Sequence, residues 1–263
     1  MRSPSSSWPQ VSDYTVEPES GKEMFNGEVR EALPAGPLHS RQHCRVDFVL
    51  SAYVAPGYGA DTDLLTRQAA EHNFASDTCI RRNGIDPDTG DRYLEELAVE
   101  IKSTQRIGAL EQRARVMAER GVRRIFAIPV RGDDAGRDVV AGPVVEWMAA
   151  EERWRIYGND ERIEDSCLSA PLPVRALLDA AAADDAVVQA LLYKGNPTLL
   201  GYGDERAREE LRSVLHLLLH ARGIAVDAAA HARIAACTDR AMLQRWAVRA
   251  ALVTSASQLF DDD

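Results

Sequence analysis

The chain has 263 residues and a formal net charge of −10 at pH 7, which is enough length for one large domain or for a core with a helical addition. Hydrophobic residues make up 45% and charged residues 27%, the usual balance for a globular protein. No apolar stretch has the length of a transmembrane helix, and no apolar segment follows the N-terminal residues as in a secretory signal. We therefore expect a cytoplasmic protein with no membrane partner. Its acidity counts against a protein that coats nucleic acid.

The N-terminal part is expected to contain a tail, a hairpin and a helix. Residues 1–20 are rich in Ser and Pro and predict a flexible tail. Residues 24–29 predict a short hairpin that turns at Asn26-Gly27. A helix is expected from His39 or Ser40 to Tyr53, because apolar residues recur there at three- and four-residue spacing, and residues 56–59 should end it.

The middle of the chain alternates expected strands and helices. Strands are predicted at 74–80 and 96–102, separated by the turn-rich residues 83–91. A helix follows at 108–120, capped by Gly121, and then the almost wholly apolar strand 124–130. Two more strands are predicted at 139–148 and 154–157, joined by a turn at 149–153.

From residue 171 onward the composition changes to Ala, Leu and Arg with helical spacing. Helices are expected at 174–191, 204–222, 227–236 and 239–258, with breaks at 195–197 and at Gly223. We therefore predict a mixed α/β core over residues 21–170, with helices flanking a mixed sheet, and an α-helical region over residues 171–263.

Cysteines and charge give weaker indications. The four cysteines lack zinc-ligand spacing and are interpreted as reduced, buried residues: Cys44, Cys79, Cys167 and Cys237. Between Lys102 and Arg124 the chain has seven basic residues and two acidic ones. That segment is either a solvated helix face or a patch that faces phosphates.

The strand predicted at 96–102 carries the clearest chemical signal. Side chains alternate along a strand, so Glu100 and Lys102 share one face while Ile101 points to the apolar side. A further carboxylate, Asp77, lies on the preceding predicted strand. The turn-rich connection between the two strands lets Asp77 and Glu100 face each other across a hairpin.

Such a set suits phosphodiester hydrolysis. Two carboxylates hold a hard cation such as Mg²⁺, which activates water and stabilises charge on phosphoryl oxygens. Lys102 would orient the attacking water or donate to the developing charge, and the carbonyl oxygen of Ile101 would be a third metal ligand. The competing interpretation is an ion pair between Glu100 and Lys102 on an exposed strand edge, with Asp77 ending a strand.

Residues 20–170 resemble the Uma-type restriction endonuclease family, a bacterial branch of the PD-(D/E)xK nuclease superfamily. The resemblance rests on short pieces in a fixed order: residues 21–28, His39 opening a helix, Ser76-Asp77 in place of Pro-Asp, the apolar-Glu strand 97–101, and residues 120–128. It implies a restriction-endonuclease-like fold with Asp77, Glu100 and Lys102 as catalytic residues. Lys102 stands in the standard place, and Arg113 occupies the position where some relatives use a helical lysine.

Other residues are weaker candidates for the site. Glu71, Glu28 and His39 are possible additional metal ligands. The acidic loop 81–93 is interpreted as a solvated hairpin loop rather than a calcium site. His216 and His220 have metal-ligand spacing on a helix, but no third ligand accompanies them in sequence, and we interpret them as flanking an apolar face.

The sequence thus favours a Mg²⁺-dependent endonuclease that acts on DNA, with Mn²⁺ as a substitute ion, and the resemblance implies a homodimer. The alternative is a nuclease-fold module without turnover that acts in nucleic-acid binding or in protein assembly through its C-terminal helices. A different metal hydrolase on the same three residues is a weaker third possibility.

Overall fold

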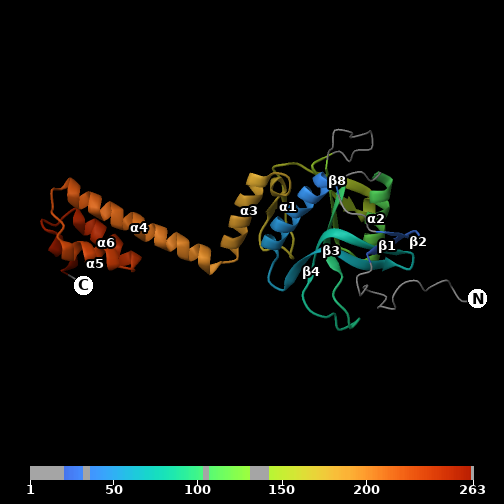
Figure 1. Ribbon diagram of the computed structural model, residues 1–263, viewed down its shortest axis with the longest axis horizontal. Coiled ribbons are helices and arrows are strands. Elements are labelled where there is room, and N and C mark those ends of the chain that lie inside the picture. Colours follow the sequence, from blue (N-terminus) through green and yellow to red (C-terminus); the bar gives the residue numbers. More distant parts are fainter. Residues whose placement is uncertain (1–20, 32–35, 103–106, 131–141, 262–263) are drawn as a thin grey trace, which may run out of the picture. The chain divides into compact units, whose positions relative to one another are not determined.

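The chain divides into two compact units between Lys194 and Gly195 (Figure 1). The computed structural model describes residues 21–31, 36–102, 107–130 and 142–261, so the predicted tail lies outside the described residues. The division falls later than the boundary expected near residue 170. Helix α3 (Ala180–Tyr193) packs against α1 (Pro37–Tyr53) and adds Ala183, Ala186 and Ala190 to the core of the first unit.

In its described residues, the first unit is built on an eight-stranded mixed sheet with the order β2-β1-β4-β5-β6-β7-β8, and β3 pairs with β4. The parallel pair is β5–β6, whereas the other neighbours run antiparallel. This confirms the predicted mixed α/β class. The strands are β1 (Lys22–Phe25), β2 (Glu28–Glu31), β3 (Tyr58–Ala69), β4 (His72–Arg82), β5 (Glu95–Lys102), β6 (Arg124–Pro129), β7 (Val144–Met148) and β8 (Arg153–Tyr157).

Helices α1 and α2 (Ile107–Arg120) cover opposite faces of this sheet (Figure 1). Val49 and Leu50 of α1 pack with Val99 of β5 in one core cluster. Met117 of α2 packs with Ala98, the neighbouring residue of the same strand, in another. Alternation along β5 therefore sends Leu97, Val99 and Ile101 toward α1, and Ala98, Glu100 and Lys102 toward α2.

Beyond the main sheet, β9 (Arg162–Ile163) pairs with β10 (Leu172–Pro173), and the 3-10 helix Val174–Leu177 leads to α3. The second unit contains α4 (Pro197–Ala221), α5 (Ala228–Ala236), α6 (Arg240–Ala250) and the 3-10 helix Ala256–Phe260. Its own core includes Leu215, Leu219 and Trp246. No helix in the described ranges is both long enough and apolar enough to span a membrane.

Most predicted elements of the core are present. The hairpin β1–β2 turns at Asn26 and Gly27, both with positive φ (53° and 75°), as the Asn-Gly pair predicts. The strand predicted at 139–148 begins only at Val144, and residues 139–141 lie outside the described residues. Strand β3 was not predicted at all.

Several C-terminal boundaries were wrong, and caps explain two of them. Asp179 caps α3 through Ala182 N, so the helix starts there rather than at residue 174. Asn196 caps α4, and Pro197 opens the helix instead of breaking the chain until residue 204. Helix α6 ends at Ala250, well before residue 258. The cysteines also differ from expectation, because Cys44 is exposed.

Candidate active site

One edge of β4 is open over four residues. Strand β3 pairs with β4 along its other edge. Two strands pair with the edge that contains this opening: β1 pairs at Asn73, and β5 pairs from Thr78 onward. Residues 74–77 lie between them, and among the described residues they have no strand partner on that side. Asp77 is the last of the four.

Side chains take the place of the missing strand in this gap. The Ala75 N–H donates to the Glu23 carboxylate at 3.0 Å. The Ala75 carbonyl accepts from Arg113 of α2 at 2.6 Å, and the Asp77 carbonyl is hydrogen-bonded to His43 Nε2 of α1. Groups from both faces of the sheet therefore converge on the four residues.

The Asp77 carboxylate connects β4 with β5 and α1. Its Oδ2 accepts the backbone N–H of Ile101 at 2.5 Å, and its Oδ1 lies 3.3 Å from His39 Nε2. The hydrogen bond to Asp77 raises the pKa of His39, although burial opposes the shift. The contact with Ile101 brings this carboxylate to the segment of β5 that carries Glu100 and Lys102.

Glu100 is buried in an ion pair. Its side chain is 4% exposed, and Arg113 Nε lies 3.1 Å from its Oε2. The same guanidinium lies over the Phe74 ring, 4.1 Å from the centroid, and 3.5 Å from Glu23. Burial raises the pKa of Glu100 to about 7, and the negative charge of Asp77 adds to the shift while Arg113 opposes it. This carboxylate is therefore costly to keep ionised without additional positive charge.

Lys102 ends β5 on the same sheet face as Glu100, and its residue is 6% exposed. Its carbonyl accepts from Val130 N at 2.8 Å. Because Glu100 and Lys102 are both buried, the competing interpretation of an ion pair on an exposed strand edge is wrong.

The other sequence candidates lie in different surroundings. Glu71 is exposed in the β3–β4 turn, six residues before Asp77, which is roughly 20 Å along a strand. Glu28 is exposed on β2 and pairs with Arg30 at 2.8 Å. Of the additional residues considered, His39 contacts Asp77 and Arg113 contacts Glu100.

Sequence reasoning missed three residues beside Asp77. His43 contacts the Asp77 carbonyl, and Asp47 accepts from Thr78 Oγ1 at 2.6 Å. Asp63 of β3 is flanked by the pairs Thr62↔Thr78 and Leu64↔Ser76, which places it beside Asp77. Burial raises the pKa of Asp63, and the charges of Asp77 and Asp47 add to the shift. The four-residue spacing of His39, His43 and Asp47 was a usable signal, whereas nothing in the sequence marked Asp63.

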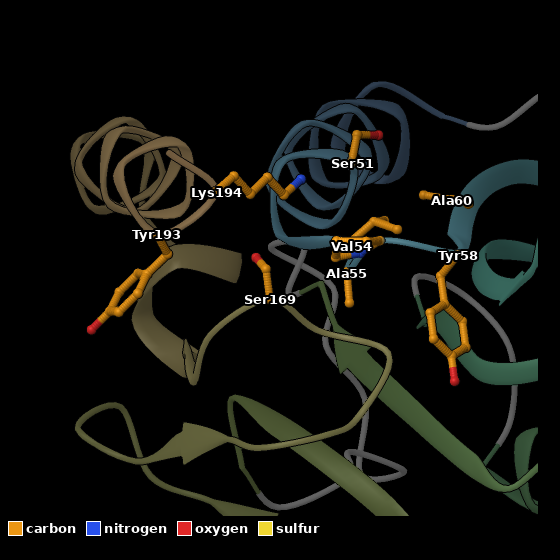
Figure 2. A pocket seen from close by; sticks show the side chains of 10 residues that line it. Ser51, Val54, Ala55, Tyr58, Ala60, Ser169, Tyr193 and Lys194 are labelled. Atoms are coloured by element: carbon orange, nitrogen blue, oxygen red, sulfur yellow. The ribbon is translucent and has the colours of Figure 1, made fainter. Parts of the chain in front are cut away.

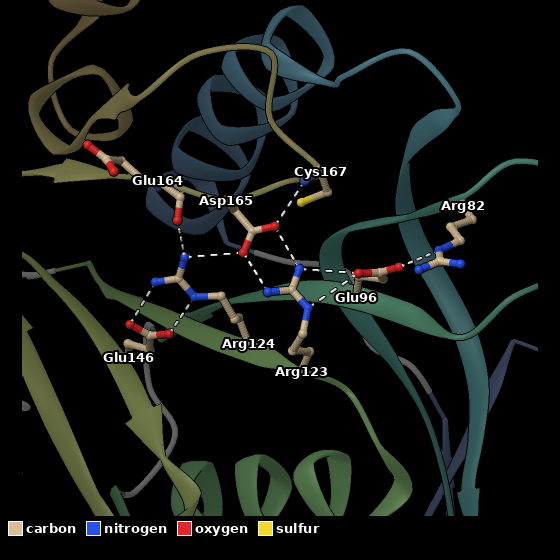
Figure 3. A network of polar contacts seen from close by, with 8 residues as sticks. All are labelled: Arg82, Glu96, Arg123, Arg124, Glu146, Glu164, Asp165 and Cys167. Carbon is tan, nitrogen blue, oxygen red and sulfur yellow. Dashed lines mark hydrogen bonds and ion pairs between the residues drawn. The ribbon is translucent and has the colours of Figure 1, made fainter.

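The basic segment is largely neutralised within the chain. Arg115 pairs with Glu152 at 3.4 Å, and Arg106 lies outside the described residues. Figure 3 shows how Arg123 and Arg124 join Asp165, with Arg123 also bound to Glu96 and Arg124 to Glu146. With Arg113 held by Glu100, the segment is neither a simple solvated face nor a free phosphate patch.

A pocket of about 620 Å³ lies at the C-terminal end of α1, whereas His39 and His43 lie near its N-terminal end (Figure 2). Apolar groups and two serines line it, together with Tyr193 and Lys194 at the end of α3. Among the described residues that line it there is no carboxylate, so the pocket does not offer the acidic oxygen ligands that a divalent cation prefers. The gap at residues 74–77 is therefore the candidate active site.

Comparison with known proteins gives little beyond this geometry. No family model and no curated protein matches the chain. Among solved structures, a protein from Anabaena variabilis ATCC 29413 described as a "putative nuclease belonging to DUF820" is similar over 61% of this chain and 92% of its own. The two are 15% identical with a TM-score of 0.46, which is too distant to assign a family or an activity.

Proposed function

We propose that the chain is a metal-dependent endonuclease that hydrolyses phosphodiester bonds in DNA, with Asp77, Glu100 and Lys102 as catalytic residues. The proposal rests first on the hydrogen bond from Ile101 N–H to Asp77 Oδ2. This contact brings a carboxylate of β4 to the stretch of β5 between Glu100 and Lys102, beside the gap at residues 74–77.

Asp77, Glu100 and the Ile101 carbonyl offer oxygen donors, the kind of ligand that a hard divalent cation prefers. The raised pKa of Glu100 reflects burial and the nearby charge of Asp77, and positive charge between the two carboxylates would relieve both effects. Asp77 and Glu100 would hold Mg²⁺, or Mn²⁺ in its place, with the Ile101 carbonyl as a third oxygen ligand. When bound, the ion supplies stabilisation of phosphoryl charge and a lower pKa for water.

The chain's own residues then position and stabilise the reacting groups. Lys102 donates to the negative charge that develops on the phosphate, and its burial strengthens this interaction because little water screens it. Arg113 fixes the Glu100 carboxylate through two nitrogens. A homodimer with one site per chain would serve the two strands of a duplex, a part of the proposal that comes from the family resemblance.

One observation favours the alternative function, a nuclease-fold module without turnover. Arg113 already occupies the Glu100 carboxylate at 3.1 Å, so an ion must share or displace that contact. If it cannot, the second unit is the functional part, acting in assembly or nucleic-acid binding.

Cleavage of supercoiled plasmid distinguishes these functions. We expect the purified protein to nick DNA with Mg²⁺ or Mn²⁺ and to stop when EDTA is added. Loss of a preorganised donor lowers the rate about 10²–10³-fold, so the cleavage rate of Lys102→Ala should fall by that factor. Lys194 is exposed, and Lys194→Ala should cut at the wild-type rate. Equal cleavage by Lys102→Ala and the wild type would contradict the assigned role. No cleavage of DNA or RNA by folded protein would favour the module.

A further inference from the structure

Helix α1 directs a row of metal-binding groups at β4. His39, His43 and Asp47 are spaced four residues apart and so lie along one face of the helix. His39 Nε2 lies 3.3 Å from Asp77 Oδ1, and His43 Nε2 contacts the carbonyl of the same residue. His43 Nε2 also lies 3.6 Å from Asp47 Oδ1. The two imidazoles therefore meet β4 at Asp77.

The potential ligand atoms converge closely. Among the described residues, His39, His43 and Asp77 each offer one ligand atom, and these atoms all lie within 4.8 Å of one another. Metal–ligand bonds of about 2.1 Å separate neighbouring ligand atoms by roughly 3–4 Å. Small side-chain rotations would bring the three atoms into that range.

The surroundings favour a cation. Asp63 and Asp47 add two carboxylates beside the two imidazoles and Asp77, and the negative charges of Asp77 and Asp47 act on Asp63. Asp63 also has a left-handed backbone with φ of 51°. A non-glycine residue in this conformation carries strain, and such positions concentrate at functional sites.

The type of donor sets the type of ion. Mg²⁺ takes oxygen ligands and keeps much of its water, whereas imidazole nitrogen suits Zn²⁺ and other first-row transition metals. A set with two imidazole nitrogens and one carboxylate oxygen therefore selects against Mg²⁺. The oxygen-only set proposed on the β5 side of Asp77 does not have this property.

We propose that His39, His43 and Asp77 bind one divalent transition-metal ion, of the class of Zn²⁺ or Co²⁺, in addition to the ion held with Glu100. The two oxygens of Asp77 face different neighbours, Oδ1 toward His39 and Oδ2 toward Ile101, so one carboxylate serves both sets. Through Asp77 the inference rests on the proposed function, which it deepens by naming a second ion and the helix that holds it.

Binding of Co²⁺ tests this site directly. Tag-free, EDTA-stripped full-length protein is titrated with Co²⁺ and followed by visible absorption, and bound metal is counted by mass spectrometry. We expect one equivalent with ligand-field bands that a large excess of Mg²⁺ does not remove. Loss even of an outer-shell partner costs about 10–100-fold in metal affinity, so His43→Ala should bind Co²⁺ at least about tenfold more weakly.

The matched control is His216→Ala. His216 lies against His231, with ring centroids 4.9 Å apart, so these two histidines lie close enough to attract Co²⁺ away from α1. The His216→Ala variant should bind Co²⁺ as the wild type does. Circular dichroism verifies folding, and His39→Gln replaces His43→Ala if the latter does not fold. Displacement by Mg²⁺, normal binding by the α1 variants, or loss of binding in His216→Ala would each overturn the proposal.

Lys102→Ala separates this proposal from the nuclease. It should bind Co²⁺ normally while losing cleavage. Co²⁺ binding by a wild-type protein that cuts nothing would sustain the metal site and refute the nuclease. Mg²⁺-dependent cleavage by a protein that does not retain Co²⁺ would sustain the nuclease and refute the metal site on α1.

Discussion

Arg113 shows how one residue fixes the state of the site. Its side chain is 12% exposed, and its guanidinium contacts Glu100, Glu23 and the Ala75 carbonyl. The sequence marked Arg113 only as a stand-in for a helical lysine, because its partners come from β1, β4 and β5, far apart along the chain. The structure shows it as the counterion of a buried carboxylate.

Replacing Arg113 should therefore destabilise the protein in a pH-dependent way. Removing one partner of a buried ion pair costs about 3–5 kcal/mol, and Arg113→Ala should lose that much free energy of unfolding at pH 8. The Glu100 pKa is already about 7 and rises further without Arg113. Glu100 then binds a proton in the folded state at pH 6, so the loss should be smaller there.

Urea unfolding at the two pH values measures this effect. Arg115→Ala is the control, because Arg115 is half-exposed and pairs with Glu152 at the surface, where an ion pair contributes about 0.2–1 kcal/mol. If Arg113→Ala matches this control, or loses more stability at pH 6 than at pH 8, Arg113 is not the counterion of Glu100.

The elements that carry the site were predictable for a shared reason. Strands β4 and β5, helix α2 and strand β6 are buried, so their apolar residues show the period of each element, and the turn-rich residues 83–91 marked the hairpin. Within the described part of the chain, strand β3 pairs with β4 alone, and it is mostly half-exposed. Its Asp, Thr and Gln residues interrupt the hydrophobic pattern by which a strand is predicted from sequence. The strand is defined by its pairing with β4 instead.

The gap in β4 could not be predicted from sequence. It arises because β1 and β5 share one edge and leave residues 74–77 between them. Hydrophobic periodicity reports which residues are buried but not which strands are neighbours. His43 and Asp63 were missed for this reason, since each belongs to the site through contacts across elements.

A charge network joins several elements at the opposite end of β5 and β6 from Lys102. Asp165, whose side chain is 2% exposed, accepts from Arg123 at 2.6 and 2.7 Å and from Cys167 N at 3.0 Å (Figure 3). Despite burial, these hydrogen bonds hold the pKa of Asp165 well below its usual range. Because the pKa of Asp165 is lower in the folded protein than in the unfolded chain, the carboxylate stabilises the fold at any pH above its unfolded pKa. This stabilisation is lost as the pH falls toward the folded pKa.

Asp165→Asn should consequently cost about 2–3 kcal/mol at pH 7, since hydrogen bonds to charged groups contribute about 1.5–3 kcal/mol each. The difference in free energy of unfolding between Asp165→Asn and the wild type should narrow below about pH 4, where the carboxyl group is protonated in the unfolded chain. Urea unfolding at pH 7 and pH 3.5 measures both, with exposed Asp160→Asn as control. A difference that widens in acid would contradict the assigned ion pairs.

At the scale of the whole molecule, the chain consists of two units with separate cores. Composition suggested a division near residue 170, because α3 is rich in Ala and Leu and shows the same helical spacing as the segments that follow it. Packing assigns α3 to the first unit, since three of its alanines join the α1 core. A helix-rich composition does not reveal which core a helix joins, so the boundary required tertiary contacts.

The net charge of −10 affects how the chain would meet the proposed DNA substrate. A nuclease of this charge must meet phosphate through local positive charge, and much of the basic segment 102–124 is paired internally. The proposed cation would therefore carry more of this task than it would in a basic protein. Cleavage should then depend strongly on the carboxylate that both proposed ions share.

Plasmid cleavage by Asp77→Asn is the most direct test of the account. The amide keeps an oxygen for the Ile101 N–H but loses the charge that holds a cation. With Mg²⁺ and with Mn²⁺, we predict that the folded variant loses cleavage by about 10²-fold or more, while exposed Asp160→Asn cuts as the wild type does. Metal-dependent cleavage by Asp77→Asn at the wild-type rate would contradict the account, because the activity would then lie outside the gap in β4.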